Sequence, residues 1–193
     1  MPGMTEFSPT AARTRRSIMT AAISLLATRP EAPMTEIAEA AGVSRSTLHR
    51  YFPDRGAMRK ALDELAHAAW VEAIGSARLD EDSGLEAFRR LCAALMDHLD
   101  VLAWWMIWPQ TWEDDDAEEP DPADVEIAKT LERGRRDGSI DPAMRADWLH
   151  NMMWAVLYSV QFAPTTSDLT AFDAREQGMR ALMKAAAANP NRI

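Results

Sequence analysis

The chain has 193 residues, a net charge of −9 and a single cysteine, Cys92. A chain of this length can bury a core without disulfides, and one cysteine cannot form a disulfide within the chain, so we expect a protein of the reducing cytoplasm. The longest unbroken apolar stretch, residues 101–108, is far shorter than the roughly 20 residues that cross a membrane, so we expect no membrane partner.

The charge is divided unevenly along the chain. Residues 1–60 hold nine Lys and Arg against five Asp and Glu, whereas residues 61–193 hold 12 against 25. A basic segment joined to an acidic body is typical of proteins whose basic part contacts nucleic acid. The overall negative charge therefore does not exclude DNA as a partner.

Apolar residues recur at helical spacing along most of the chain, and alternating β-branched segments are nearly absent, which predicts an all-α protein. A first helix is expected over residues 11–28, ended by the prolines that follow it. Thr35 is the predicted N-cap of a short second helix that Gly42 ends. Ser44 is the predicted N-cap of a third helix over residues 45–51.

The remaining helices are longer. Asp54 is the predicted N-cap of a fourth helix that runs to about residue 77. Asp141 is the predicted N-cap of a helix with Pro142 at its first position, and residues 164–168 are a predicted turn. Four long helices are expected over residues 85–100, 123–137, 142–163 and 169–188.

The second and third helices have the pattern of a helix-turn-helix. A glycine permits the sharp turn between two such helices, and small apolar residues fill the seam. With Leu48 turned to the seam, steps of about 100° per residue place Ser46 and Arg50 on the opposite face of the helix. That face is polar, basic and narrow enough for a DNA major groove. The predicted seam consists of Ile37, Ala38, Ala41, Val43, Leu48 and Phe52.

The stretch MTEIAEAAGVSRSTLHRYFPDRGAMRKAL resembles the DNA-binding region of the TetR family of bacterial transcriptional repressors, and the resemblance covers roughly residues 13–62. Farther along, LERGRRDGSIDP resembles the family's common connection before its dimerisation helices. The resemblance implies an N-terminal three-helix helix-turn-helix DNA-binding domain over residues 1–60. It implies a larger helical effector-binding and dimerisation domain over residues 61–193, and a repressor released from its operator by a small molecule.

The same resemblance assigns particular residues to DNA. It implies phosphate contacts for Thr35 and Tyr51, and base or phosphate contacts for the arginines of the third helix. His49 stands where the family often has a tyrosine, and Arg55 where it often has a lysine. The full predicted set is Thr35, Arg45, Ser46, Thr47, His49, Arg50, Tyr51 and Arg55.

The last two expected helices carry broad apolar faces, which predict a four-helix bundle between two copies of the chain. The faces consist of Trp148, Leu149, Met152, Val156, Val160, Phe172, Met179, Leu182, Met183 and Ala186. A homodimer offers two recognition helices to a near-palindromic double-stranded DNA operator, with half-sites about 10 bp or a multiple apart.

The stretch LAWWMIWPQTWEDDD is rich in tryptophan and ends in acidic residues. A helix broken at Pro109 and rich in aromatics is one way to wall a cavity, and tryptophan faces attract cations. We therefore expect a small hydrophobic effector, aromatic or cationic, of the type exported by multidrug pumps. The predicted effector-binding residues are Met96, Trp104, Trp105, Trp108, Trp112, Met152 and Met153. The alternative is that these tryptophans belong to the core.

Two other kinds of function compete with this one. The chain has no GxSxG, no P-loop, no dinucleotide glycine pattern and no paired metal-binding histidines, so we expect no enzyme, cofactor or metal. A second possibility is a DNA-binding regulator whose acidic, Trp-rich C-terminal domain binds a protein partner. An aromatic-lined cavity favours the small effector, whereas an exposed Trp patch favours the protein partner.

Overall fold

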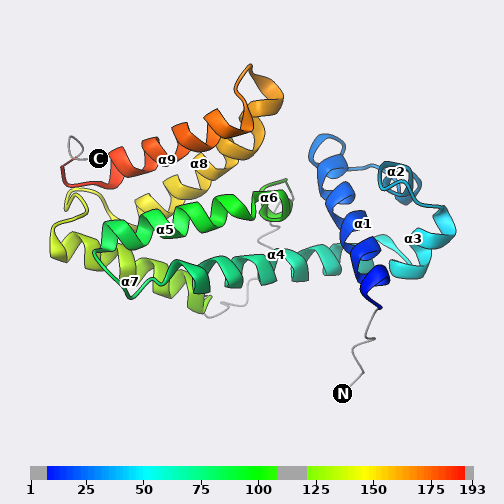
Figure 1. Cartoon of the computed structure of the whole chain (residues 1–193), viewed down its shortest axis with the longest axis horizontal. Helices are drawn as coiled ribbons and strands as arrows, with labels where there is room; N and C mark the ends of the chain where they lie inside the picture. The colour runs from blue at the N-terminus through cyan, green and yellow to red at the C-terminus, as the bar shows by residue number, and fades with distance from the viewer. Residues whose placement is uncertain (1–7, 108–120, 190–193) are drawn as a thin grey trace. The chain divides into compact units, whose positions relative to one another are not determined.

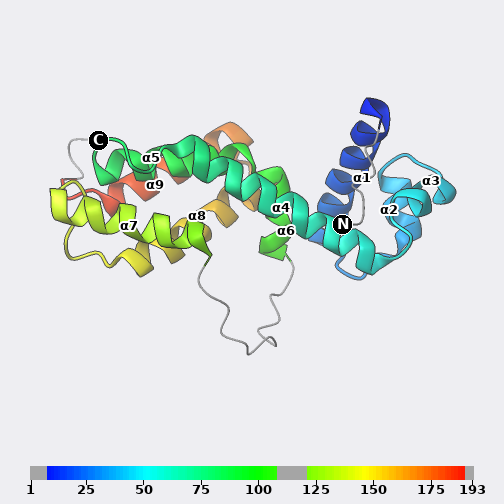
Figure 2. The same cartoon turned by 90° about the horizontal axis from the view of Figure 1, so that it is seen from below.

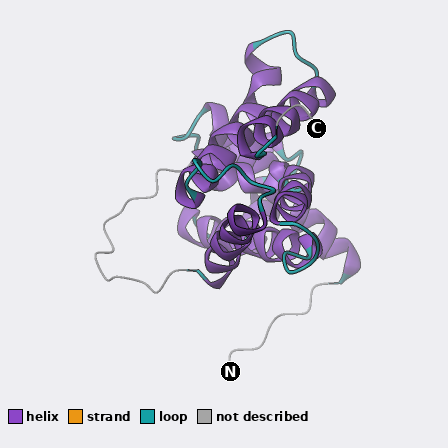
Figure 3. Cartoon of the chain, turned by 90° about the vertical axis from the view of Figure 1, so that its left-hand side faces the viewer, coloured by secondary structure: helices purple, strands orange, loops and turns teal. Residues whose placement is uncertain are grey.

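A computed structural model describes residues 8–107 and 121–189 of the chain. Within these ranges there are nine helices and no strand, apart from an isolated bridge between Ile140 and Ala187 (Figure 3). The predicted all-α fold class is confirmed. None of the helices in the described ranges is both long and apolar enough to cross a membrane.

The chain divides into two compact units. The N-terminal unit comprises Met1–His67 together with Ala103–Pro109, and the C-terminal unit comprises Ala68–Leu102 together with Gln110–Ile193. The helices α4 (Arg55–Ala77) and α6 (Leu99–Ile107) each contribute residues to both units. Part of the Trp-rich stretch therefore groups with the residues that are expected to bind DNA.

The N-terminal unit is built on three helices, α1 (Pro9–Thr28), α2 (Met34–Ala40) and α3 (Arg45–Tyr51) (Figure 1). The predicted seam between α2 and α3 is confirmed where it is deepest, because four of its residues are at most 2% exposed: Ile37, Ala38, Leu48 and Phe52. The other two seam residues, Ala41 and Val43, are half-buried. Apolar residues of α1 complete this core, namely Ile18, Met19, Ala22, Ile23 and Leu26.

The C-terminal unit contains four further helices, α5 (Gly84–Asp97), α7 (Pro122–Asp137), α8 (Ala146–Thr166) and α9 (Ala171–Ala186). In Figure 1 α8 and α9 run side by side, and Figure 2 shows α7 alongside α8. α5 packs against α7 and α9. The core of the unit lies where these helices meet, and among its fully buried residues are Phe88, Leu91, Leu131, Met153 and Leu157.

A glycine pair lets α5 and α7 approach closely. A Cβ atom on Gly84 would lie only 2.2 Å from the backbone nitrogen of Gly134. No real side chain tolerates that distance, and backbone cannot move aside as a side-chain tip can. The Gly84 N–H also donates to the Asp137 carboxylate at 2.9 Å, which ties the start of α5 to the end of α7.

Two predicted helix starts are wrong. α2 begins at Met34, so Thr35 lies inside the helix and its hydroxyl is not the N-cap. The carboxylate of Asp141 instead closes a short turn by accepting from the Ala143 N–H at 2.9 Å, and α8 begins only at Ala146. An aspartate followed by a proline suits a turn as well as a helix start, which explains the second error.

Two other helix boundaries also differ from expectation. The helix expected over residues 85–100 ends at Asp97, and α6 begins at Leu99. The predicted turn at 164–168 is wrong at its start, because α8 continues through Pro164 to Thr166. A proline in the last turn of a helix forfeits one hydrogen bond and leaves the earlier turns intact.

The apolar faces of α8 and α9 are partly used inside the subunit. Five of the residues predicted to face a second copy are buried within the chain, because α8 and α9 pack on each other and on α5: Leu149, Val160, Leu182, Met183 and Ala186. Large side chains that stay exposed on this hairpin are Trp148 (61%), Tyr158 (50%) and Phe172 (75%). The face that remains outside is therefore narrower and more aromatic than the sequence pattern predicted.

Candidate functional site

The turn between α2 and α3 has the geometry of a helix-turn-helix. Gly42 has φ +66°, a left-handed conformation that glycine adopts at little cost. The Val43 N–H donates to the carbonyl of Ala38 at 2.9 Å and closes the turn. Ser44 then caps α3 by accepting from the Thr47 N–H at 3.1 Å, as predicted.

α3 presents a polar and basic surface. Arg45, Ser46, His49 and Arg50 are exposed, whereas Leu48, which belongs to the buried seam, is 1% exposed. The hydroxyls of Ser46 and Thr47 both hydrogen-bond to the Ser44 hydroxyl at 2.9 Å, so the start of α3 is held by a small hydroxyl network. The polar and basic side chains that were predicted to face outward from α3 are thus exposed.

His49 and Tyr51 are held from within the N-terminal unit. The Nδ1 of His49 lies 3.1 Å from the carbonyl oxygen of Pro53, and since a carbonyl only accepts, Nδ1 is the donor. In the neutral ring Nε2 is then an acceptor for a partner outside the chain. The Arg50 guanidinium lies 5.3 Å from the centroid of the Tyr51 ring, a cation–π distance.

The other two residues assigned to DNA are Thr35, near the start of α2, and Arg55, the first residue of α4. The Arg55 guanidinium donates to the carbonyl of Ala32 at 2.6 Å and also to that of Pro30, so it fastens the connection between α1 and α2. Thr35 is half-buried. A phosphate contact by either residue stays a prediction.

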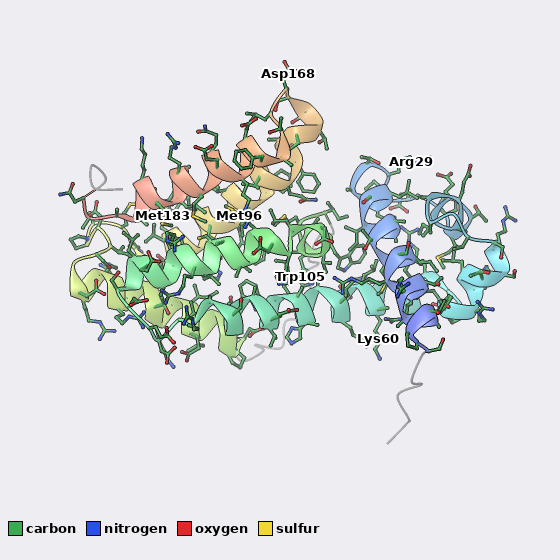
Figure 4. All side chains as sticks on the ribbon, viewed as in Figure 1. Arg29, Lys60, Met96, Trp105, Asp168 and Met183 are labelled. Carbon is green, nitrogen blue, oxygen red and sulfur yellow. The ribbon has the colours of Figure 1, made fainter. Side chains whose placement is uncertain are left out.

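The predicted effector-binding residues are divided between the two units. Trp104 belongs to the N-terminal unit, where it is 1% exposed and its indole N–H donates to Asp63 at 2.5 Å. Trp105 is half-buried in the same unit (Figure 4). Trp108 and Trp112 lie outside the described residues.

Trp104 borders a hollow of about 240 Å³ in the N-terminal unit, together with Leu26, Ile37, Met58 and Leu62. These apolar side chains are themselves almost completely buried. The surroundings of Trp104 are therefore those of a core residue that anchors α6 to α4, as in the alternative interpretation of the sequence.

The predicted methionines lie in the C-terminal unit. Met96 is 5% exposed and lies between α5 and α9, where its Cε would be 3.4 Å from a Cβ on Gly178 (Figure 4). Met153 is fully buried and Met152 is half-buried. Their part in effector binding stays a prediction.

The structure brings together an aromatic cluster in the C-terminal unit that the sequence did not predict. The rings of Trp70 and Trp154 stack with centroids 5.4 Å apart and planes at 28°. The Trp154 Nε1–H donates to Nε2 of His150 at 3.3 Å, and the same Nε2 lies 3.6 Å from Asp124. The sequence shows that His150 and Trp154 are one helical turn apart. It does not show that Trp70 of α4 packs against Trp154 of α8.

A groove of about 960 Å³ runs between α7 and α8 and begins at this cluster. Asp124 and His150 line it at the start of α7, and Arg135, Arg136 and Arg145 line it near the end of α7. Burial raises the pKa of Asp124, His150 opposes the rise and the Asp121 carboxylate adds to it. Within the described part of the chain, no group of three or more His, Cys, Asp or Glu could hold a metal ion.

An all-α chain with a capped helix-turn-helix and a basic outward face on its second helix defines the class of DNA-binding transcriptional regulators. Residues 18–62 match the sequence model of the bacterial regulatory proteins of the tetR family. The HTH-type transcriptional repressor LfrR of Mycolicibacterium smegmatis is 34% identical over 148 residues, which cover 75% of this chain and 76% of that protein. The chain belongs to the TetR family.

Solved structures agree with this assignment. The crystal structure of LfrR from Mycobacterium smegmatis has a TM-score of 0.67 and 25% identity, and the match covers 92% of this chain and 98% of that chain. The LfrR structure in complex with proflavine has a TM-score of 0.64 and 26% identity, covering 91% of this chain and 97% of that chain. The HTH-type transcriptional regulator NfxB of Pseudomonas aeruginosa is 34% identical over 76 residues, 39% of this chain and 41% of that protein. These relatives are transcriptional regulators.

Proposed function

We propose that this chain is a ligand-controlled repressor that binds an operator through α3 and leaves it when a small hydrophobic effector binds the C-terminal domain. The proposed division is residues 1–60 for DNA and residues 61–193 for effector and dimer. The observation that carries the proposal is the outward face of α3, where exposed cationic and hydroxyl side chains stand beside one another on a capped helix. Such a surface suits the acceptor-rich edges and phosphates of a major groove.

Different residues of α3 would contact different parts of the DNA. Arg45 and Arg50 are exposed cations that can reach guanine edges or phosphates. Ser46 and Thr47 supply hydroxyls at the start of the helix, and His49 supplies a ring nitrogen. Tyr51 and Thr35 are proposed to contact phosphates at the margins, and the charge of Arg55 adds to the potential that attracts DNA.

We propose a homodimer formed through α8 and α9. Trp148, Tyr158 and Phe172 are at least half exposed on this hairpin, and the Tyr158 ring lies 4.7 Å from that of Phe162. Exposed aromatic side chains on two adjacent helices favour a protein interface over a free surface. Two copies related by a twofold axis would carry two α3 helices to a near-palindromic operator.

The proposed effector is a flat hydrophobic molecule, aromatic or cationic, of the multidrug type. LfrR has been crystallised with proflavine, a flat aromatic dye, and LfrR resembles this chain over most of its length. The strongly acidic C-terminal part of the chain favours a cation over an anion. The effector would act by binding more tightly to the form of the dimer that does not fit the operator.

The experiment begins with selection of bound sequences from randomised DNA, followed by fluorescence anisotropy with the selected operator. We expect proflavine to release the wild-type protein from it. Arg50→Ala removes one exposed cation from α3, so operator affinity should fall about 10- to 100-fold while proflavine binding is unchanged. Arg89→Ala is the matched control, because Arg89 is exposed in the C-terminal unit and paired with Glu86 at 2.6 Å.

Two results would contradict different parts of this proposal. If Arg50→Ala binds the operator as tightly as the wild type, α3 is not the reading helix. If neither proflavine nor a neutral aromatic binds the wild-type protein while operator binding is intact, the regulator with a protein partner on its C-terminal domain becomes the better interpretation.

A further inference from the structure

One carboxylate of the α7–α8 groove is left without a cationic partner. Asp124 has its Oδ1 3.6 Å from Nε2 of His150, and in the described part of the chain no lysine or arginine pairs with it. The neighbouring carboxylate of Asp121 caps α7 by accepting from the Ala123 N–H at 2.8 Å and adds a second negative charge nearby. The raised pKa of Asp124 agrees with a partly buried carboxylate that needs a positive charge.

His150 does not donate a hydrogen bond to Asp124 while its Nε2 accepts from Trp154. The Trp154 indole N–H can only donate, so at 3.3 Å Nε2 of His150 must be the acceptor and carries no proton. The same nitrogen cannot at once donate to Asp124. In this arrangement the imidazole therefore gives Asp124 no hydrogen bond, and the carboxylate can accept one from another cationic group.

Most of the other charged groups of the groove have a partner of opposite charge, and Arg136 donates to the backbone carbonyl of Glu132 at 3.2 Å. The ammonium of Lys129 lies 2.7 Å from Glu126, and the Arg135 guanidinium 2.6 Å from Glu132. Arg145 and Asp147 pair with each other at 2.5 Å. Because a helix rises about 1.5 Å per residue, Arg135 also lies roughly 16 Å along α7 from Asp124. Among the described carboxylates that line the groove, Asp124 is the one without a lysine or arginine partner, so a cation at this end is attracted to it.

We propose that Asp124 binds the cationic group of an aromatic effector at the start of the α7–α8 groove, beside the imidazole of His150. The indole of Trp154, which stacks on Trp70, hydrogen-bonds to His150 and holds the imidazole beside Asp124. The inference rests on the proposed function, because it names the site and the chemical class of the same effector. The groove, at about 960 Å³, has room for a tricyclic ring system.

The test uses the full chain with proflavine as the probe, titrated by fluorescence and calorimetry. Asp124→Asn keeps the shape and removes the charge, and we expect proflavine affinity to fall about tenfold or more. Asp147→Asn is the matched control, because Asp147 lines the same groove but is already paired with Arg145. This control should change the affinity less than about twofold.

A second pair of variants, at His150 in α8, tests the same Asp124 carboxylate. His150→Lys places a permanent cation beside Asp124, which should compete with the dye and lower its affinity about tenfold. His150→Gln is the uncharged counterpart: it keeps an acceptor for Trp154 and adds no cation, so it should lower proflavine affinity less than His150→Lys does. A structural defect in α7 could weaken binding by Asp124→Asn, but His150→Lys leaves α7 unchanged. Loss of binding in both variants therefore cannot come from a defect in α7 alone.

The outcomes distinguish this inference from the function on which it rests. If Asp124→Asn binds proflavine as the wild type does, or if Asp147→Asn loses as much affinity, the assignment to Asp124 is overturned while dye-induced release from the operator still stands. If the wild-type protein neither binds proflavine nor leaves the operator in its presence, the proposed effector class fails and this site with it.

Discussion

The outward face of α3 and the α7–α8 groove both carry arginines, but only the groove also holds a carboxylate that no lysine or arginine of the described chain pairs with. On α3, Arg45 and Arg50 are exposed, and no ion pair joins either of them to a carboxylate of the described chain. In the groove, Arg135 and Arg145 each have an acidic partner within 2.6 Å, and Arg136 donates to the backbone carbonyl of Glu132 at 3.2 Å. At the other end of the groove, no lysine or arginine of the described chain pairs with Asp124. The count of charges on a surface thus says less about its ligand than which charge is left unpaired.

This difference also explains how one chain can be acidic overall and bind DNA. A polyanion is attracted by cations that have no internal partner, and the ion pairs of the C-terminal unit largely cancel at a distance. Residues 61–193 hold 25 acidic residues against 12 basic ones, and this negative charge disfavours anionic effectors and favours cations. The two surfaces should therefore respond independently to substitutions, and the three predictions below test that independence.

The largest effect is expected where α5 crosses α7. Gly84→Ala places a methyl group 2.2 Å from the backbone of Gly134, so the two helices must separate. We expect the free energy of unfolding of the C-terminal unit to fall by about 3 kcal/mol, measured by chemical denaturation. Proflavine binding should weaken with it, because α7 forms one wall of the groove.

Gly75→Ala is the control for this substitution. Gly75 is an exposed helical glycine of the same unit, and a Cβ there would meet nothing within 4 Å. Alanine favours the helix by up to about 1 kcal/mol over glycine, so this variant should be as stable as the wild type or more so. Equal losses in both variants would show that the close crossing of α5 and α7 is not what requires glycine at position 84.

Trp104→Phe tests to which of the two surfaces the Trp-rich stretch belongs. The substitution keeps most of the buried ring but removes the indole N–H that donates to Asp63. A hydrogen bond to a charged group contributes about 2 kcal/mol, so the N-terminal unit should lose about that much stability. Proflavine affinity should stay within about twofold of the wild type, since Trp104 belongs to the N-terminal unit. If Trp104→Phe bound proflavine tenfold more weakly without a loss of stability, Trp104 would belong to the effector site.

The two surfaces were not equally predictable from the sequence. The helix-turn-helix depends on contacts between residues close in the chain, such as the Ser44 cap and the turn at Gly42, and both were predicted correctly. The aromatic cluster joins Trp70 of α4 to Trp154 of α8, and periodicity within one helix carries no information about which distant helix faces it. For the same reason the burial of Trp104 against α4 was open to two interpretations.

The smallest effect is expected at the start of α3. Ser44→Ala removes the hydroxyl that accepts from the Thr47 N–H and also hydrogen-bonds to the Ser46 and Thr47 side chains. Loss of such a cap costs about 1 kcal/mol, and the first turn of the recognition helix should fray. Operator affinity should therefore fall about fivefold in the anisotropy assay, with proflavine binding unchanged. Ser44→Asp restores a capping acceptor but adds a negative charge near the phosphates, so it should recover stability without recovering affinity. Recovery of both would mean that Ser44 acts on DNA only through the stability of α3, and that the charge of this surface matters less than the unpaired arginines indicate.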